Sequence, residues 1–299
     1  MPNAAPPLAT EAKTATIALA LPAAPGSRKR LPKQARRTLL HIGTLIIAIL
    51  VWWAISAVGL VQPLFLPGPV AVWEAFLKAN SCYPASEGAT RIVCGAQNYF
   101  LWEHLLASLR RISIGVSLGI VFGVLLGFAM TRIRWFGFIA DPYLNFLRAL
   151  PPLGYIGLLI VWFGIGDESK LWLLFLASFP PITMATIAAV KGISESRIHA
   201  LQALGASQRQ VLMHVILPSS LPGIIGGVRI ATGLAWTTVV AAELNNGIPG
   251  IGGVAYLAGT QLQTALVIAS IIIIGLAAVA LDQLIRVIGD LLVPWYGRA

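Results

Sequence analysis

Long apolar runs separated by short polar segments dominate the chain from about residue 39 onward. The clearest runs are Leu39–Leu60, Ile112–Met130, Leu171–Val190 and Ala265–Ala280, and each is close to the ~20 residues that a membrane-spanning helix needs. Backbone polar groups in lipid must be satisfied within the spanning segment, so such runs predict helices. We therefore expect an all-α polytopic membrane protein with six transmembrane helices, at about 39–60, 107–130, 137–164, 171–190, 221–243 and 264–288.

The remaining segments divide the chain into a tail and a membrane domain. Residues 1–37 are rich in Ala, Pro and Thr and have no amphipathic period, which predicts a disordered tail before a membrane domain at 38–299. Lys and Arg concentrate in this tail, the 131–135 turn, the 191–220 loop and the C-terminus. Because cytoplasmic loops carry an excess of Lys and Arg, both termini are predicted to be cytoplasmic and the 61–106 loop external.

Composition excludes a water-soluble globule, and the charge distribution indicates what the basic residues contact. Of 299 residues, 57% are hydrophobic and only 11% are charged, against roughly 25% charged residues in soluble domains. The net charge is +10, and six basic residues crowd between Arg28 and Arg37, directly before the first span. This cluster indicates contact with anionic lipid headgroups of the bilayer rather than binding of nucleic acid.

Two cysteines, Cys82 and Cys94, lie in the predicted external loop. They are too few for a zinc site or a disulfide framework. Two interpretations remain open: a disulfide that closes a short loop in an oxidising compartment, or two free thiols.

The third predicted span contains Pro151-Pro152, with Arg148 just before them. Proline breaks a helical hydrogen-bond ladder, and a membrane tolerates the break where neighbours or a watery cavity satisfy the freed carbonyls. Arg148 is costly in mid-span unless it is paired or faces water. This span is therefore predicted to line something polar, the alternative for Arg148 being a structural ion pair.

Glycines recur every four residues in the second span, at Gly115, Gly119, Gly123 and Gly127. The ladder predicts a flat helix face for close packing. The same stretch matches a serine-hydrolase G-x-S-x-G pattern at 115–119, but that motif requires a strand-to-helix elbow with His and Asp partners. An intramembrane hydrolase is therefore a minor alternative.

Nucleotide and metal motifs give no cofactor for this chain. Residues 250–255 match a dinucleotide fingerprint without the flanking βαβ unit, and the sequence has neither a phosphate-binding G-x-x-x-x-G-K-[ST] loop nor an H-E-x-x-H motif. No metal site is predicted, and any ATP-Mg must be bound by another chain. An ATP-independent secondary transporter predicts paired broken helices in internal repeats, and only one strong break is found, so this class is a minor alternative.

The predicted cytoplasmic loop reads as a short helix, a glycine, a second helix and a Leu-Pro stop. It resembles the coupling loop of ABC import permeases, whose pattern is E-A-A, three residues, Gly, nine residues and I-x-L-P. Gly205, Val215, Leu217 and Pro218 fall at the matching spacing. The loop departs from the pattern at His199, which replaces the usual Glu.

The resemblance implies that this loop contacts an ATPase subunit. At Leu201 the sequence also departs from the second Ala of the pattern, so a salt bridge made by the family Glu is not expected here. The coupling residues implied are Glu195, Arg197, His199, Ala200, Ala203, Leu204, Gly205, Ala206, Val215, Leu217 and Pro218.

Most of the chain after residue 44 resembles the nitrate, sulfonate and taurine permease family, and taurine permeases in particular. Matching segments are Asp141-Pro142, Leu147-Arg148, Pro151-Pro152-Leu153, Trp162–Gly166, Gly227-x-Arg229, Gly233-x-Ala235-Trp236, Ala241–Glu243, Pro63–Pro67, the run from Leu101 through His104 and Ser108 to Arg111, and Leu292–Gly297. The segment Ser81–Asn98 looks like an insertion relative to this family.

The resemblance implies the type I ABC importer permease fold in a bacterial inner membrane. It also implies a second permease copy, two cytoplasmic ATPase subunits that bind ATP-Mg, and a periplasmic substrate-binding protein. The solute would be a small sulfonate such as taurine, with nitrate, bicarbonate or another small solute as alternatives. Candidate residues of the translocation pathway are Arg148, Pro151, Pro152, Tyr155, Trp236, Glu243, Asn245 and Asn246. Glu243 is expected either to pair with a basic residue or to gate the outer mouth.

Overall fold

The computed structural model describes residues 33–84, 90, 92–245 and 247–295, with side chains from residue 39 onward. The chain forms two compact units that divide between Leu50 and Val51. Helix α1 (Lys33–Val58) begins inside the segment predicted to be a disordered tail. This correction has a local cause, because Lys33–Arg37 contains Lys, Gln, Ala and Arg, which are good helix formers. The rest of the predicted tail lies outside the described residues.

Five helices in the described residues are long and apolar enough to cross a membrane, and a bent helix pair makes a sixth span if it is counted as one. The five are the apolar part of α1, helix α3 (Leu101–Arg132), helix α6 (Asp167–Lys191), the run Gln208–Glu243 and helix α11 (Thr264–Leu292). The prediction of an all-α polytopic fold is therefore confirmed.

The third predicted span is two helices instead of one. Helix α4 (Arg134–Ala149) ends before Pro151, and the 3₁₀ turn η1 (Pro152–Tyr155) with helix α5 (Ile156–Phe163) leaves at an angle of 95°. Leu150 and Pro151 are both extended, as expected because a residue before proline avoids the α region. The predicted break at Pro151-Pro152 is thus confirmed, and the two helices make one broken span if the bent pair is counted together.

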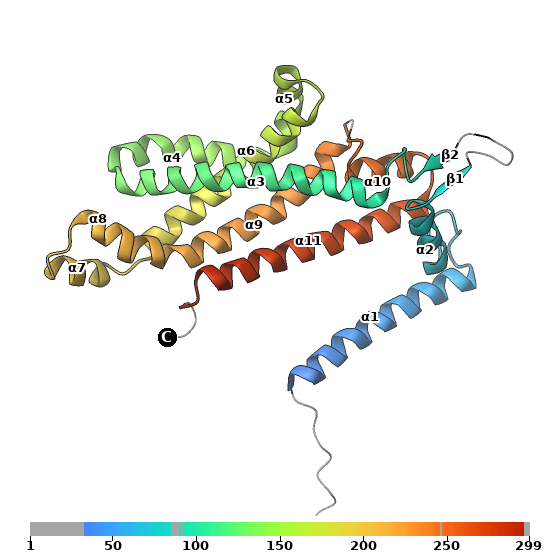
Figure 1. Cartoon of the computed structure of the whole chain (residues 1–299), viewed down its shortest axis with the longest axis horizontal. Helices are drawn as coiled ribbons and strands as arrows, with labels where there is room; N and C mark the ends of the chain where they lie inside the picture. Colours follow the sequence, from blue (N-terminus) through green and yellow to red (C-terminus); the bar gives the residue numbers. More distant parts are fainter. Residues whose placement is uncertain (1–32, 85–89, 91, 246, 296–299) are drawn as a thin grey trace, which may run out of the picture. The chain divides into compact units, whose positions relative to one another are not determined.

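Small residues determine how the long helices pack. Helices α3, α6, α9 (Leu217–Glu243) and α11 run side by side (Figure 1). A Cβ added at Gly115, Gly119, Gly123 or Gly127 of α3 would press against Leu174, Ser178, Ile182 or Thr186 of α6, respectively. The interpretation of the ladder as a packing face is therefore confirmed. It also removes the serine-hydrolase interpretation, because the motif lies within a helix packed against another helix.

Replacing a ladder glycine with a larger residue is expected to destabilise the membrane domain. An added Cβ at Gly127 would lie 2.6 Å from Thr186 Cβ, and overpacking of this kind costs about 1–3 kcal/mol. We expect Gly127→Leu to lower the unfolding temperature in detergent, measured by fluorescence-detected size exclusion. The control is Gly275→Leu in α11, where an added Cβ meets nothing within 4 Å. Equal unfolding temperatures for the two variants would contradict the packing role.

The helices joining α6 to α9 lie at one end of this bundle. Helix α7 (Glu195–Ala203) is separated by a turn from helix α8 (Gln208–Val211). From α8 the chain continues without a break through the π-helical turn η2 (Leu212–Ile216) into α9. The expected Leu-Pro stop at Leu217-Pro218 is therefore wrong. Pro218 has no N–H to donate to the preceding turn, and the π turn directly before α9 lets the helix continue.

A different set of short elements lies at the opposite end, as Figure 1 shows. These elements are helix α2 (Pro69–Lys78), strands β1 (Cys82–Pro84) and β2 (Ile92–Cys94), and helix α10 (Ile251–Thr260). The strands pair antiparallel with Cys82 opposite Cys94, and a disulfide joins these two residues.

Candidate functional site

The loop predicted to couple to an ATPase has a defined turn at Gly205. Gly205 has φ of 82°, a left-handed conformation that glycine adopts without steric cost. Ser207 then caps α8, because its Oγ accepts the N–H of Gln210 while the Gln210 side chain accepts the N–H of Ser207. This capping box starts the second helix directly after the turn.

The predicted coupling residues divide into an exposed group and a supporting group. The exposed residues are Glu195, Arg197, His199, Ala200, Ala203, Leu204 and Gly205, and Ala206 is half-buried. The supporting residues lie in η2 and at the start of α9: Val215, Leu217 and Pro218. Leu204 is 86% exposed. Arg132 at the end of α3 donates to the Gln208 side chain at 3.2 Å. The exposed Leu204, which we call the tip of the coupling loop, thus lies beside α8, and α8 continues into α9.

A buried charge network lies at the other end of α9. Glu243 is 1% exposed, and its Oε1 accepts a hydrogen bond from Arg111 Nη1 at 2.7 Å. Its Oε2 accepts the Gly252 N–H at 2.9 Å. Ser108 Oγ lies 2.7 and 2.9 Å from the two carboxylate oxygens. The carboxylate therefore ties α3, α9 and α10 together in a region where an unpaired charge is expensive.

Ser108 and one further α3 side chain, His104, hold the start of α10. Ser108 Oγ accepts the Ile251 N–H at 3.0 Å, and His104 Nδ1 accepts the Gly250 N–H at 3.0 Å. His104 Nε2 lies 2.9 Å from the Ala96 carbonyl oxygen, so the ring carries its proton on Nε2 and donates there. Helix α10 is thereby fixed to α3 through its first backbone amides, which have no partners within the helix.

Arg111 also connects the network to the start of α6. Its Nε lies 2.9 Å and its Nη2 2.7 Å from Asp167 Oδ1, and Lys170 Nζ lies 3.9 Å from the same oxygen. Arg111 is 4% exposed, whereas the Asp167 side chain is 54% exposed. One guanidinium therefore joins a buried carboxylate to one at the surface.

The predicted pathway residues occupy different environments. Arg148, Pro151 and Asn245 are exposed, and Tyr155 packs against a buried cluster that includes Ala242 of α9. The broken span thus packs against the C-terminal end of α9. Pro152 is half-buried, and Asn246 lies outside the described residues.

Trp236 and Glu243 are part of the protein interior in this conformation. Trp236 is 5% exposed and belongs to a core cluster with Ile112 and Val116 of α3. Of the two expectations for Glu243, pairing with a basic residue is what the structure contains, because Arg111 occupies its Oε1. Trp236 also lines a cavity of about 630 Å³ between α9 and α11.

A second charged pair lies within the membrane-spanning helices. Arg229 of α9 donates from Nε to Asp282 Oδ1 at 2.9 Å and from Nη2 to Oδ2 at 2.7 Å. The two side chains are 38% and 41% exposed. Such a bidentate pair fixes the relative position of α9 and α11, because separating the two charges inside a membrane is costly.

Removing one partner of this pair is expected to harm the protein more than removing both. Arg229→Leu leaves Asp282 without its guanidinium in the membrane, whereas Arg229→Leu combined with Asp282→Leu leaves no charge unpaired. We expect the single variant to yield less folded protein and the double variant to recover part of that yield, measured by monodisperse protein after extraction. Additive losses in the double variant would contradict coupling between the two side chains.

The partners of Glu243 were not predicted from the sequence. A signal was present, because His104, Ser108 and Arg111 are spaced i, i+4 and i+7 and so lie on one face of α3. Arg229 and Asp282 carry no such local signal. Among the described residues, no cluster of three or more His, Cys, Asp or Glu side chains is placed to hold a metal ion.

Comparisons with known proteins agree with this geometry. Residues 119–298 match the model of a family described as binding-protein-dependent transport system inner membrane component. The chain is 40% identical over 267 residues to the taurine transport system permease protein TauC of Escherichia coli (strain K12), covering 88% of this chain and 92% of that protein.

A second relative in sequence and one solved structure are also similar to most of this chain. The chain is 33% identical over 241 residues to the putative aliphatic sulfonates transport permease protein SsuC of Escherichia coli (strain K12), covering 79% of this chain and 92% of that protein. It is similar in fold to a chain of a crystal structure of an amino acid ABC transporter with histidines, with a TM-score of 0.50 and 15% identity over 64% of this chain and 91% of that chain.

The chain therefore belongs to the family of binding-protein-dependent transport system inner membrane components, and it is the permease subunit of an ABC importer. Within that class it falls among the permeases for taurine, sulfonates and nitrate. The homologues are permease components rather than enzymes, and the family implies ATPase and binding-protein partners.

Proposed function

We propose that this chain forms the membrane path of an ATP-driven importer that moves a small sulfonate such as taurine inward by alternating access. The observation that carries the proposal is the 40% identity to TauC over almost the whole length of that protein. The exposed apolar tip of the coupling loop supports the ATP-driven part of the proposal, because that loop is where an ATPase subunit would dock.

The proposed assembly contains two copies of this permease, two ATPase subunits that bind ATP-Mg and a periplasmic substrate-binding protein. Both chain termini and α7 face the cytoplasm, and the disulfide hairpin of β1 and β2 faces the periplasm. The disulfide between Cys82 and Cys94 supports this orientation, because disulfides persist in oxidising compartments.

The long helical run Gln208–Glu243 provides the mechanical connection. It begins beside the coupling loop and ends in the buried Arg111–Glu243 network at the opposite end of the bundle. In the proposed mechanism, closure of the ATPase pair moves α7 and the base of this run together. ATP binding favours the outward-open state, hydrolysis resets it, and the two sites share a coupling free energy.

The solute path is proposed to follow the break between α4 and α5. Arg148 and Tyr155 lie on either side of Pro151-Pro152, where the backbone leaves its helical ladder. The exposed Asn245 marks the neighbouring end of α9. An exposed guanidinium at Arg148 suits an anionic or zwitterionic solute. Trp236 and Glu243 support the walls of this path rather than contact the solute.

The proposal is tested by ATPase stimulation in liposomes that contain this chain with its ATPase and binding protein. The solutes compared are taurine, alkanesulfonates and nitrate. We expect taurine to give the largest stimulation. Stimulation by nitrate alone would replace the sulfonate assignment, and a rate that no solute changes would contradict the importer function.

A further inference from the structure

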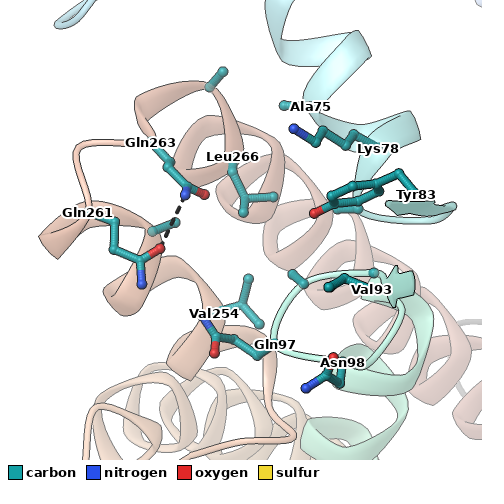
Figure 2. A pocket seen from close by; sticks show the side chains of 15 residues that line it. Ala75, Lys78, Tyr83, Val93, Gln97, Asn98, Val254, Gln261, Gln263 and Leu266 are labelled. Carbon is teal, nitrogen blue, oxygen red and sulfur yellow. Dashed lines mark hydrogen bonds between the residues drawn. The ribbon is translucent and has the colours of Figure 1, made fainter. Parts of the chain in front are cut away.

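A cavity of about 570 Å³ opens at the end of the bundle opposite the coupling loop. It lies between α2, the segment that carries β1 and β2, α10 and the turn before α11. Figure 2 shows Lys78 and Tyr83 on one side of the cavity and Gln261 and Gln263 on the other. Gln97 also lines it. We call this cavity the amide groove.

The groove is lined by amide side chains and by one charged group. Gln97, Asn98, Gln261 and Gln263 each bring an amide that both donates and accepts hydrogen bonds. Lys78 is the one charged side chain among the described lining residues, and its Nζ lies 4.8 Å from the centre of the Tyr83 ring. The groove is therefore complementary to a carboxylate flanked by groups that both donate and accept.

The walls of the groove are held in place before any partner arrives. The Cys82–Cys94 disulfide closes the hairpin, and the Gly95 N–H donates to the Ser81 carbonyl at 2.9 Å. His104 holds the Ala96 carbonyl. Helix α10 is fixed by the Glu243 network described above. A preorganised surface loses little conformational entropy on binding.

We propose that the amide groove receives an acidic surface loop of the importer's substrate-binding protein, an inference that rests on the proposed function and orientation. Peptide groups carry one donor and one acceptor each, which matches the amides of Gln97 and Asn98 and the groups that the hydrogen bond from Gln263 Nε2 to Gln261 Oε1 leaves free. Lys78 pairs with the acidic side chain. A free small anion would instead call for several converging cations.

The hairpin segment supplies much of the groove wall. Tyr83, Val93 and residues 95–98 of the groove all come from the segment Ser81–Asn98. The sequence predicts that this segment is an insertion relative to the family, and on that prediction the groove selects one binding protein over those of related importers.

The test measures direct binding of the solute-loaded binding protein to the complete importer in nanodiscs, by biolayer interferometry. We compare wild type with Lys78→Glu, Lys78→Gln and Gln261→Ala. The control is Arg110→Gln, which removes an exposed cation of α3 that does not line the groove. ATPase stimulation is recorded in parallel on the same samples.

We expect Lys78→Glu to raise the dissociation constant about tenfold or more, as charge reversal at an interface does. Lys78→Gln should weaken the salt dependence of binding, Gln261→Ala should weaken binding severalfold, and Arg110→Gln should bind as wild type does. Cleaving the disulfide with a reductant should accelerate dissociation.

One result would overturn the groove assignment and leave the proposed function intact: wild-type binding and ATPase stimulation with a dissociation constant unchanged by Lys78→Glu. Failure of the proposed function gives a different result, namely binding that depends on Lys78 without any ATPase stimulation.

Discussion

Replacing Glu243 with leucine is expected to destabilise the permease more than any of the other single substitutions. Arg111 would remain buried with only the exposed Asp167 as a charged partner, and Gly252 N–H would lose its acceptor. Breaking a buried ion pair from one side costs about 3–5 kcal/mol. We expect little monodisperse protein after extraction and a clearly lower unfolding temperature in what remains.

Two further variants separate loss of the pair from loss of folding in general. Arg111→Met combined with Glu243→Leu should recover part of the stability, because it leaves no buried charge unpaired. Glu168→Gln, which neutralises an exposed carboxylate of α6, should behave as wild type. If Glu243→Leu unfolds at the wild-type temperature, the network does not hold these helices together.

The second large effect is expected at the tip of the coupling loop. Leu204 is 86% exposed, and burying a leucine at an interface contributes about 1.5–3 kcal/mol, which corresponds to a tenfold or greater change in affinity. We expect Leu204→Asp to reduce co-purification of the ATPase subunit by about tenfold or more, with the unfolding temperature of the permease nearly unchanged.

The matched control is Leu262→Asp. Leu262 is 65% exposed and lies in the turn between α10 and α11, at the other end of the bundle. It should leave ATPase co-purification at the wild-type level. Gly205→Val should act like Leu204→Asp, because a β-branched side chain is strongly disfavoured in the left-handed turn at φ 82°. Equal losses in the Leu204 and Leu262 variants would contradict the assignment of the docking tip.

Features that depend on a few neighbouring residues could be predicted from the sequence. The Pro151-Pro152 break follows from proline geometry alone. The packing face of α3 follows from helical periodicity, which places glycines four residues apart on one side of the helix. The Gly205 turn followed from the spacing of a known loop pattern. In each case the information lies within a few neighbouring residues.

Features that depend on distant residues could not be predicted. Glu243 meets Arg111 across 132 residues of sequence, and Arg229 meets Asp282 across 53. Their partners are set by how the helices pack, which apolar periodicity does not specify. The continuation of the helix through Leu217-Pro218 was missed because a π turn absorbs the proline, and no local pattern indicated that turn.

ATP-driven accumulation of labelled taurine tests the central claim most directly. The complete importer is placed in proteoliposomes, the binding protein and taurine are supplied on the hairpin side, and ATP-Mg on the coupling-loop side. We predict that taurine accumulates against its gradient with ATP and that Leu204→Asp abolishes the accumulation. Equal accumulation without ATP would instead identify an ATP-independent transporter and would contradict ATP-driven import by this chain.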